Sequence, residues 1–322
     1  MVRHKFSTNV APFGPCADRF CTGGYRAALS VEERLETASR VGGLDGIEVF
    51  AGMIDSLGMA RIRSVLADVG LECSLVACGV WGDSSWGYGS FSSNSPSTRR
   101  RAVDTLRRSM DYAAELGAGR VNLWLGQDGH DYAFQVDYKD AWKHMIDGLG
   151  ECALHDPAVR ICIEPKLCEP RVRSQISSVG RLLWLCNRIG EPNIGVNVDF
   201  GHVMQAWESP AEAAVLASID GRLFHTHFND AYPNWDWDLM PGTVHPYELI
   251  EICFWLEELE YDGWYSLDTF PAREDNVRAL SHGIANIKHA LDLVGRLDKD
   301  AVRDRLLAHD AIGVRELVDL VR

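Results

Sequence analysis

Short apolar runs that could form buried strands recur eight times along the chain, and each is followed by a longer stretch with helical character. Several of the runs are apolar on both faces, as parallel strands covered by helices must be. The expected strands are 6–10, 46–50, 72–78, 120–125, 159–164, 194–199, 223–228 and 264–268. A strand followed by a helix, repeated eight times in 322 residues, predicts an α/β fold of the (β/α)₈ barrel type.

The stretches between these runs carry helix signals. Ser30 followed by Glu33 is a capping-box pattern, and Gly117 follows an amphipathic stretch as a C-terminal cap. We expect helices at 30–41, 55–68, 98–116, 138–154, 176–189, 210–218, 246–259 and 275–295. The chain is thus predicted to hold a catalytic barrel, 1–296, and a helical extension, 297–322. An open doubly wound sheet fits less well, because the loop after the first strand has no GxGxxG phosphate-binding pattern.

The charge of the chain excludes some classes of partner. There are 32 Lys and Arg against 46 Asp and Glu, a formal net charge of −14, which disfavours binding to nucleic acid or anionic membranes. No apolar run approaches the roughly 20 residues that cross a bilayer, and the N-terminus lacks the apolar core of a signal peptide. Nine cysteines without a CxxC pair argue against a disulfide framework or a cysteine zinc site. We therefore expect a cytoplasmic protein.

Acids and histidines gather where the later strands end, which is the active face of such a barrel. They are Glu164, Asp199, His202, His225, His227, Asp268 and, on the loop after the seventh strand, Asp236 and Asp238. So many carboxylates brought together need a cation among them. Carboxylate and imidazole ligands suit Mg²⁺, Mn²⁺ or Co²⁺ better than a thiolate-type zinc site does. The sequence therefore predicts a divalent metal centre.

The candidate ligands divide into two sets. Four strands can each place one ligand on an inner ion: Glu164, Asp199, His227 and Asp268. Asp199 could bridge to an outer ion that is held from loops by His202, Asp236 and Asp238. Strand alternation points His225 and His227 to the same face, so either could be the imidazole ligand. His227 lies nearer the end of its strand, which favours it.

These segments resemble the xylose isomerase-like TIM barrels, and the match to xylose isomerase itself runs over about residues 70–275. IEPKLCEPR resembles a family segment with a metal-binding Glu and a substrate-contacting Lys, which implies those roles for Glu164 and Lys166. VDFGH, DWDLMPG and LDTFPARED resemble the other ligand segments. The resemblance implies a bridging ligand, three outer ligands and a last inner ligand, at Asp199, His202, Asp236, Asp238 and Asp268 respectively.

The resemblance extends to the substrate pocket and the assembly. It implies that Trp86 and Trp124 form apolar pocket walls, and that the chain forms a dimer or tetramer. FGPCADRFC resembles a loop of rhamnose isomerases that lends a Phe to the neighbouring subunit, which assigns this role to Phe20. Two positions depart from xylose isomerase. His227 stands where that enzyme has an Asp, as in rhamnose isomerases and sugar 3-epimerases, and Ala51 stands at the ring-opening His.

The function implied is metal-dependent interconversion of an aldose and a ketose by a 1,2-hydride shift. Two divalent ions, Mn²⁺, Co²⁺ or Mg²⁺, would act on a small sugar, with Lys166, Glu164 and Asp236 as catalytic residues. The main alternative is a sugar 3-epimerase, which needs one metal and two carboxylates and leaves the outer ligands unexplained. A related enzyme acting on a modified sugar stays open. An endonuclease IV-like nuclease is disfavoured by the net charge, and a purely structural or sugar-binding barrel by the open outer site.

Overall fold

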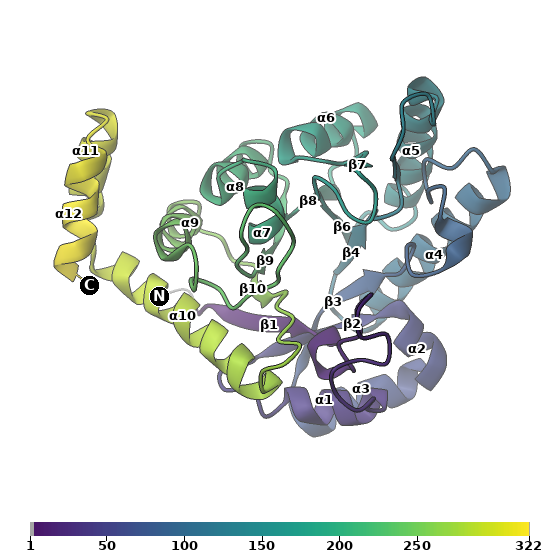
Figure 1. Cartoon of the computed structure of the whole chain (residues 1–322), viewed down its shortest axis with the longest axis horizontal. Coiled ribbons are helices and arrows are strands. Elements are labelled where there is room, and N and C mark those ends of the chain that lie inside the picture. The colour runs from purple at the N-terminus through teal and green to yellow at the C-terminus, as the bar shows by residue number, and fades with distance from the viewer. Residues whose placement is uncertain (1–2, 322) are drawn as a thin grey trace.

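The computed structural model describes residues 3–321 and confirms the (β/α)₈ barrel (Figure 1). Eight parallel strands in this part of the chain close a barrel in the order β1-β10-β9-β8-β6-β4-β3-β2. The barrel strands are β1 (Lys5–Asn9), β2 (Gly46–Phe50), β3 (Glu72–Cys78), β4 (Arg120–Trp124), β6 (Arg160–Glu164), β8 (Ile194–Asp199), β9 (Leu223–Phe228) and β10 (Trp264–Leu267). Each predicted strand end lies within one residue of the observed one.

The helices of the described residues surround the barrel on its outer side, except for the last two, which extend beyond it (Figure 1). They are α1 (Val31–Ala38), α2 (Ala51–Leu57), α3 (Met59–Val69), α4 (Pro96–Glu115), α5 (Tyr138–Ala153), α6 (Val179–Ile189), α7 (Phe200–Gln205), α8 (Pro210–Ile219), α9 (Pro246–Glu258), α10 (Asn276–Arg296), α11 (Lys299–Leu307) and α12 (Ala311–Val321). Ser30 and Glu33 form the predicted capping box of α1.

Three local features differ from the expected pattern. The helix expected at 55–68 is two helices, because Gly58 between α2 and α3 adopts a φ of 82°, which a side chain would disfavour. The short helix α7 was not expected; the Asp199 carboxylate caps it by accepting a hydrogen bond from the His202 amide. A two-stranded antiparallel sheet, β5 (Gly129–His130) with β7 (Arg173–Ser174), adds to the loops beyond β4 and β6.

Strand alternation separates the packing surface from the site. In β8, Val196 and Val198 belong to the hydrophobic core, whereas Asn197 and Asp199 turn toward polar neighbours inside the barrel. Both kinds of side chain are buried, so every residue of β8 is buried. The inward residues of β8 therefore bring buried polar groups to the end of the strand.

The last two helices, α11 and α12, form a separate hairpin beyond the end of α10 (Figure 1). Arg303 and Lys299 pair with Glu258 at the end of α9, and the Tyr247 hydroxyl donates to Asp319 at 2.7 Å. Among residues 3–321, no helix combines the length and the apolar character needed to span a membrane.

Candidate metal centre

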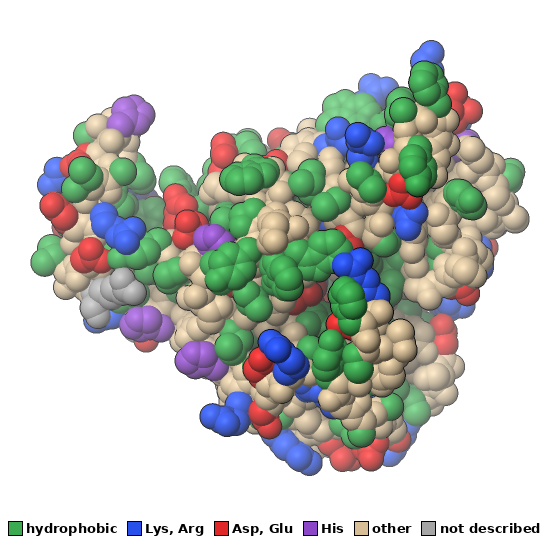
Figure 2. All heavy atoms as spheres, viewed as in Figure 1, with side chains coloured by type: hydrophobic (Ala, Val, Ile, Leu, Met, Phe, Trp, Pro, Cys, Tyr) green, Lys and Arg blue, Asp and Glu red, His purple; other side chains and the backbone are tan. Residues whose placement is uncertain are grey.

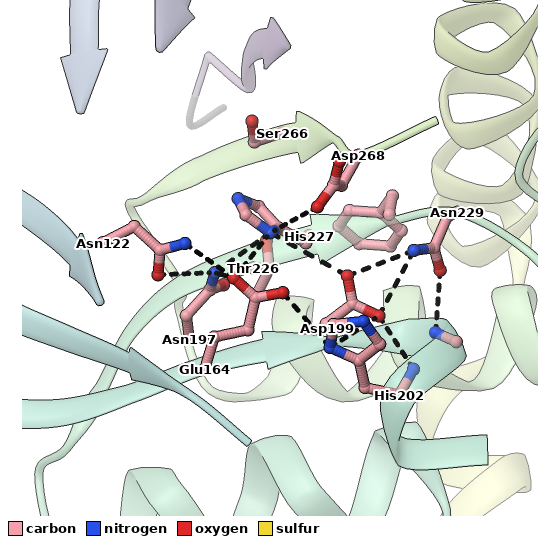
Figure 3. Close-up of polar contacts among 12 residues, drawn as sticks. Asn122, Glu164, Asn197, Asp199, His202, Thr226, His227, Asn229, Ser266 and Asp268 are labelled. Atoms are coloured by element: carbon pink, nitrogen blue, oxygen red, sulfur yellow. Dashed lines mark hydrogen bonds and ion pairs between the residues drawn. The ribbon is translucent and has the colours of Figure 1, made fainter. Parts of the chain in front are cut away.

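Four side chains from the ends of neighbouring strands converge inside the barrel mouth (Figure 3). Glu164, Asp199, His227 and Asp268 each offer one ligand atom, and these atoms all lie within 4.8 Å of one another. The Nδ1 atom of His227 lies 3.5 Å from Glu164 Oε2, 3.8 Å from Asp199 Oδ2 and 3.4 Å from Asp268 Oδ2. We call these four residues the inner cluster. It unites the four residues that the sequence analysis assigned to an inner ion.

Asparagine amides hold the carboxylates of the inner cluster in place. The donors are Asn122 to Glu164 at 2.6 Å, Asn229 to the two oxygens of Asp199 at 3.1 and 3.2 Å, and Asn9 to Asp268 at 2.5 Å. Sequence reasoning did not identify Asn9, Asn122 or Asn197 as site residues. The available signal was an amide within an otherwise apolar strand, because a buried amide needs a polar partner.

The predicted outer ligands lie beside the inner cluster but are linked mainly by ion pairs. His202 Nε2 lies 3.0 Å from Asp236 Oδ2, and His202 Nδ1 lies 3.2 Å from Glu164 Oε1. Lys166 Nζ lies 2.7 Å from the same Asp236 oxygen and 2.5 Å from Glu169. Among the described residues, the outer set does not form a group of ligand atoms as close as the inner cluster.

The loop that carries Asp236 and Asp238 is fastened at its two ends by Asp230. This fully buried carboxylate accepts hydrogen bonds from the Val244 and His245 amides at 2.7 and 2.9 Å and lies 2.8 Å from His245 Nδ1. The backbone of Asp230 also pairs with that of Leu239. These contacts return residues 231–243 toward the barrel mouth and so place the outer acids near the strand ends.

The charges in the site are unevenly compensated. Burial and neighbouring carboxylates raise the pKa values of Asp199 and Asp238, and they raise the pKa of Asp268 to about 7. Burial also opposes the ionisation of Glu164 and Asp236. The rings of His227, beside Glu164, and His202, beside Asp236, outweigh this effect of burial. They hold the pKa values of both carboxyl groups well below their usual range. Burial opposes protonation of Lys166, yet Asp236 and Glu169 raise its pKa.

The donor set fits a divalent cation. The inner cluster combines three carboxylates with one imidazole, and the raised carboxyl pKa values indicate negative charge that the protein's own cations do not balance. In the outer set, Asp236 Oδ1 is buried without a hydrogen-bond partner in the described residues, an arrangement that a bound ion would relieve. All nine cysteines are free and none belongs to the inner cluster.

A second polar group lies deeper in the barrel and was missed from the sequence. Glu48 in β2 lies 2.9 Å from His225 Nε2 and 3.2 Å from His227 Nε2. His225 therefore faces Glu48 and not the inner cluster, and burial lowers its pKa to about 4, which favours a neutral ring. The available signal was an acid in the middle of a buried strand, GIEVF.

A cavity of about 1490 Å³ opens above the candidate centre, and its lining includes Asp236, Asp238, Trp235, Trp237 and Phe20. In the view of Figure 2, hydrophobic, acidic and basic side chains meet around the middle of the molecule. Phe20 is 79 % exposed and lines the cavity of its own chain. Aromatic and carboxylate side chains together in one lining suit a polar ligand.

The two predicted pocket tryptophans differ in position. Trp124 lies at the end of β4, with Lys166 Nζ 5.1 Å from its ring centroid. Trp86 is buried, and the Arg101 Cζ atom lies 3.5 Å from the centroid of its ring. Neither Trp86 nor Trp124 is among the residues that line the cavity. Ala51, at the position of the family's ring-opening histidine, is buried at the start of α2.

Comparison with known proteins agrees with the barrel fold. The family model of the xylose isomerase-like TIM barrels matches residues 35–297. A xylose isomerase of Thermus thermophilus is 27 % identical over 232 residues, which is 69 % of this chain. The match spans 60 % of the length of that enzyme.

Solved structures show the same fold at low sequence identity. An L-ribulose 3-epimerase superposes with a TM-score of 0.73 at 18 % identity, covering 91 % of this chain and 96 % of that one. A D-psicose 3-epimerase of Clostridium cellulolyticum H10 gives 0.69 at 15 % identity, covering 89 % and 99 %. A 3-keto-D-glucoside 4-epimerase of E. coli gives 0.68 at 14 % identity, covering 89 % and 100 %.

Proposed function

The chain belongs to the xylose isomerase-like TIM barrels, and from this we propose that it is a divalent-metal-dependent isomerase that interconverts an aldose and a ketose. The observation that carries the proposal is the position of Lys166. This buried cation, 6 % exposed, pairs with the outer acid Asp236 at 2.7 Å, and Asp236 in turn contacts His202, which lies beside Glu164 of the inner cluster. A sugar oxygen that gains negative charge during isomerisation needs such a donor.

The residues that would hold the ions are those of the inner cluster and the outer set. Glu164, Asp199, His227 and Asp268 would hold one ion, and Asp199, His202, Asp236 and Asp238 a second. Mn²⁺, Co²⁺ or Mg²⁺ bound there would supply a Lewis acid for the oxygens of the substrate. We expect the same chain to act on a small sugar that enters through the cavity above the centre.

The protein groups divide the remaining work. Lys166 donates a hydrogen bond to the oxygen on C1 as charge develops there, and the ring of Trp124 limits access of water to its ammonium group. Asp236 stays ionised, and its Oδ1 atom has no partner among the described residues, so it can accept a hydrogen bond from a substrate hydroxyl and orient it. Glu164 is held by Asn122 and orients the substrate oxygens.

The buried Ala51 limits which sugars fit the proposal. A methyl group cannot open a pyranose ring by proton transfer, so another group must do this or the sugar must bind in its open form. D-xylose is therefore not the substrate that we propose.

A reaction panel in deuterium oxide tests the function. We expect the protein with Mn²⁺, Co²⁺ or Mg²⁺ to interconvert one aldose–ketose pair, because the outer set accompanies the inner cluster. A hydride shift retains the substrate hydrogen, so mass spectrometry of the product should find little deuterium on carbon. A panel without any aldose–ketose conversion would contradict the proposal.

Epimerisation at C3 is the second candidate, favoured by one observation. Glu164 and Asp268 approach His227 Nδ1 from different strands, at 3.5 and 3.4 Å, and could flank one carbon of a sugar. Two carboxylates placed in this way can remove a proton on one face and return one on the other. In the deuterium experiment an epimerase would add one deuterium to the product carbon.

Substitution of the two barrel histidines tests which imidazole binds metal. We expect His227→Asn to weaken Mn²⁺ binding more than about 100-fold, since a direct ligand should matter more than its supporting groups. His225→Asn should keep the wild-type affinity to within about tenfold, because His225 contacts Glu48 and not the inner cluster. Isothermal titration of the metal-free proteins measures both, and the reverse order would assign the ligand to His225.

A further inference from the structure

Glu48 is a carboxylate inside the barrel that the proposed reaction does not use. It is 2 % exposed, and β2, which carries it, is separated from β9 by β1 and β10 in the barrel order. Ser266 donates a hydrogen bond to its Oε1 atom, and His225 and His227 approach the same oxygen through their Nε2 atoms. A carboxylate buried so completely needs several polar partners, and here two of them are histidines of one strand.

The two ring nitrogens of His227 face different partners. Nε2 lies 3.2 and 3.3 Å from the two oxygens of Glu48, whereas Nδ1 faces the three carboxylates of the inner cluster. A carboxylate can only accept a hydrogen bond, so Nε2 must carry a hydrogen. Asn197 Nδ2, a donor, lies 3.1 Å from Nδ1, which agrees with a lone pair on that atom. Both contacts therefore favour the same tautomer.

We propose that Glu48 is a positioning residue that orients His227 as a metal ligand. It accepts the Nε2 hydrogen, fixes the plane of the ring and increases electron donation from Nδ1 toward the inner ion. His225 and Ser266 donate to the same carboxylate and keep it in place. The inference rests on the proposed metal site but not on which sugar reaction occurs there.

This role explains why an acid stands in the middle of a buried strand. The inner cluster has an imidazole, His227, where the resemblance to xylose isomerase places a fourth carboxylate. Glu48 supplies a negative charge on the far side of the imidazole, where it contacts Nε2 and not the inner cluster. The three inner carboxylates would contact a bound ion directly, and Glu48 would act on it only through the ring of His227.

The test compares Mn²⁺ binding of the metal-free wild-type protein and the Glu48→Gln variant by isothermal titration. We expect Glu48→Gln to weaken Mn²⁺ binding by about 10- to 100-fold, the usual effect of losing a partner of a metal-bound histidine. The matched control is Ser266→Ala, which removes another donor to the same carboxylate and should change the affinity less than about fivefold. Circular dichroism verifies that each variant is folded.

Nitrogen NMR of ¹⁵N-histidine-labelled protein gives a second, independent result with the diamagnetic ion Mg²⁺. The wild-type protein should show His227 with its hydrogen on Nε2 and the ion on Nδ1, and Glu48→Gln should show a mixture of tautomers. The inference is overturned if the wild-type protein carries the hydrogen on Nδ1, a result that requires no variant to fold. It is also overturned if Glu48→Gln binds Mn²⁺ with wild-type affinity and keeps the Nε2 hydrogen. A wild-type protein that binds neither ion would overturn the proposed function as well.

Discussion

Replacing Lys166 with methionine is expected to reduce sugar turnover by about 10³-fold or more while the protein still binds its metal. The ammonium group is 6 % exposed and lies between Asp236 and Glu169, at 2.7 and 2.5 Å. Loss of one preorganised donor to a developing oxyanion costs about 10²–10³ in kcat, and here a full charge is removed. Methionine matches the length and apolar stem of lysine. The measurement is kcat on the active sugar of the panel, together with the metal content of the purified variant.

The control for this variant is Lys143→Met, which removes an exposed lysine that pairs with Asp147 on α5. It should leave both kcat and metal content unchanged, because surface ion pairs contribute little. Unchanged turnover in Lys166→Met would exclude the catalytic role of Lys166. If the variant loses both turnover and metal, Lys166 supports the structure of the metal site and its catalytic role is not demonstrated.

Removal of the metal with EDTA is expected to abolish activity and lower the thermal stability, and Mn²⁺, Co²⁺ or Mg²⁺ should restore both. Without a cation, Asp199, Asp238 and Asp268 repel one another, as their raised pKa values indicate. An ion that binds only the folded state, at a free concentration of about 100 times its Kd, adds about 2.7 kcal/mol to the free energy of unfolding. For a chain of this size that corresponds to several degrees in Tm.

Calorimetry and an activity assay on the same metal-free sample separate the two effects. The charge-neutral variant Asp268→Asn is a useful comparison, because it should lose activity yet show a smaller loss of stability on treatment with EDTA. Full activity in EDTA, at a metal content below one ion per several chains, would contradict both the metal centre and the proposed isomerase.

Much of the fold was predictable because its main determinants are local. Residues of β8 such as Val196 and Val198 are apolar and β-branched, and every predicted strand ended within one residue of its observed position. Errors arose where one residue decided the backbone: Gly58 interrupts a helix that hydrophobic periodicity alone would continue. The short helix α7 is stabilised at its start by the side chain of Asp199, a residue that the sequence analysis had assigned to metal alone.

The candidate site was predictable to the extent that it lies at strand ends. Because the carboxyl ends of all barrel strands meet on one face, Glu164, Asp199 and Asp268 could be expected to converge before any distance was known. The outer acids Asp236 and Asp238 follow the family motif. Their position also depends on Asp230, whose hydrogen bonds to the far end of the loop have no sequence signature.

The sequence by itself determined the barrel, the edge at which its acids gather and the surplus of negative charge there, because strand periodicity and strand direction are enough for these. Only the tertiary structure shows that His225 and His227 face different partners. Both side chains point to the same side of β9, and they differ in what lies opposite each ring. Glu48 reaches His225 across the barrel from β2, more than 170 positions earlier in the chain. Contacts between such distant positions are set by the closure of the barrel, which no local pattern records.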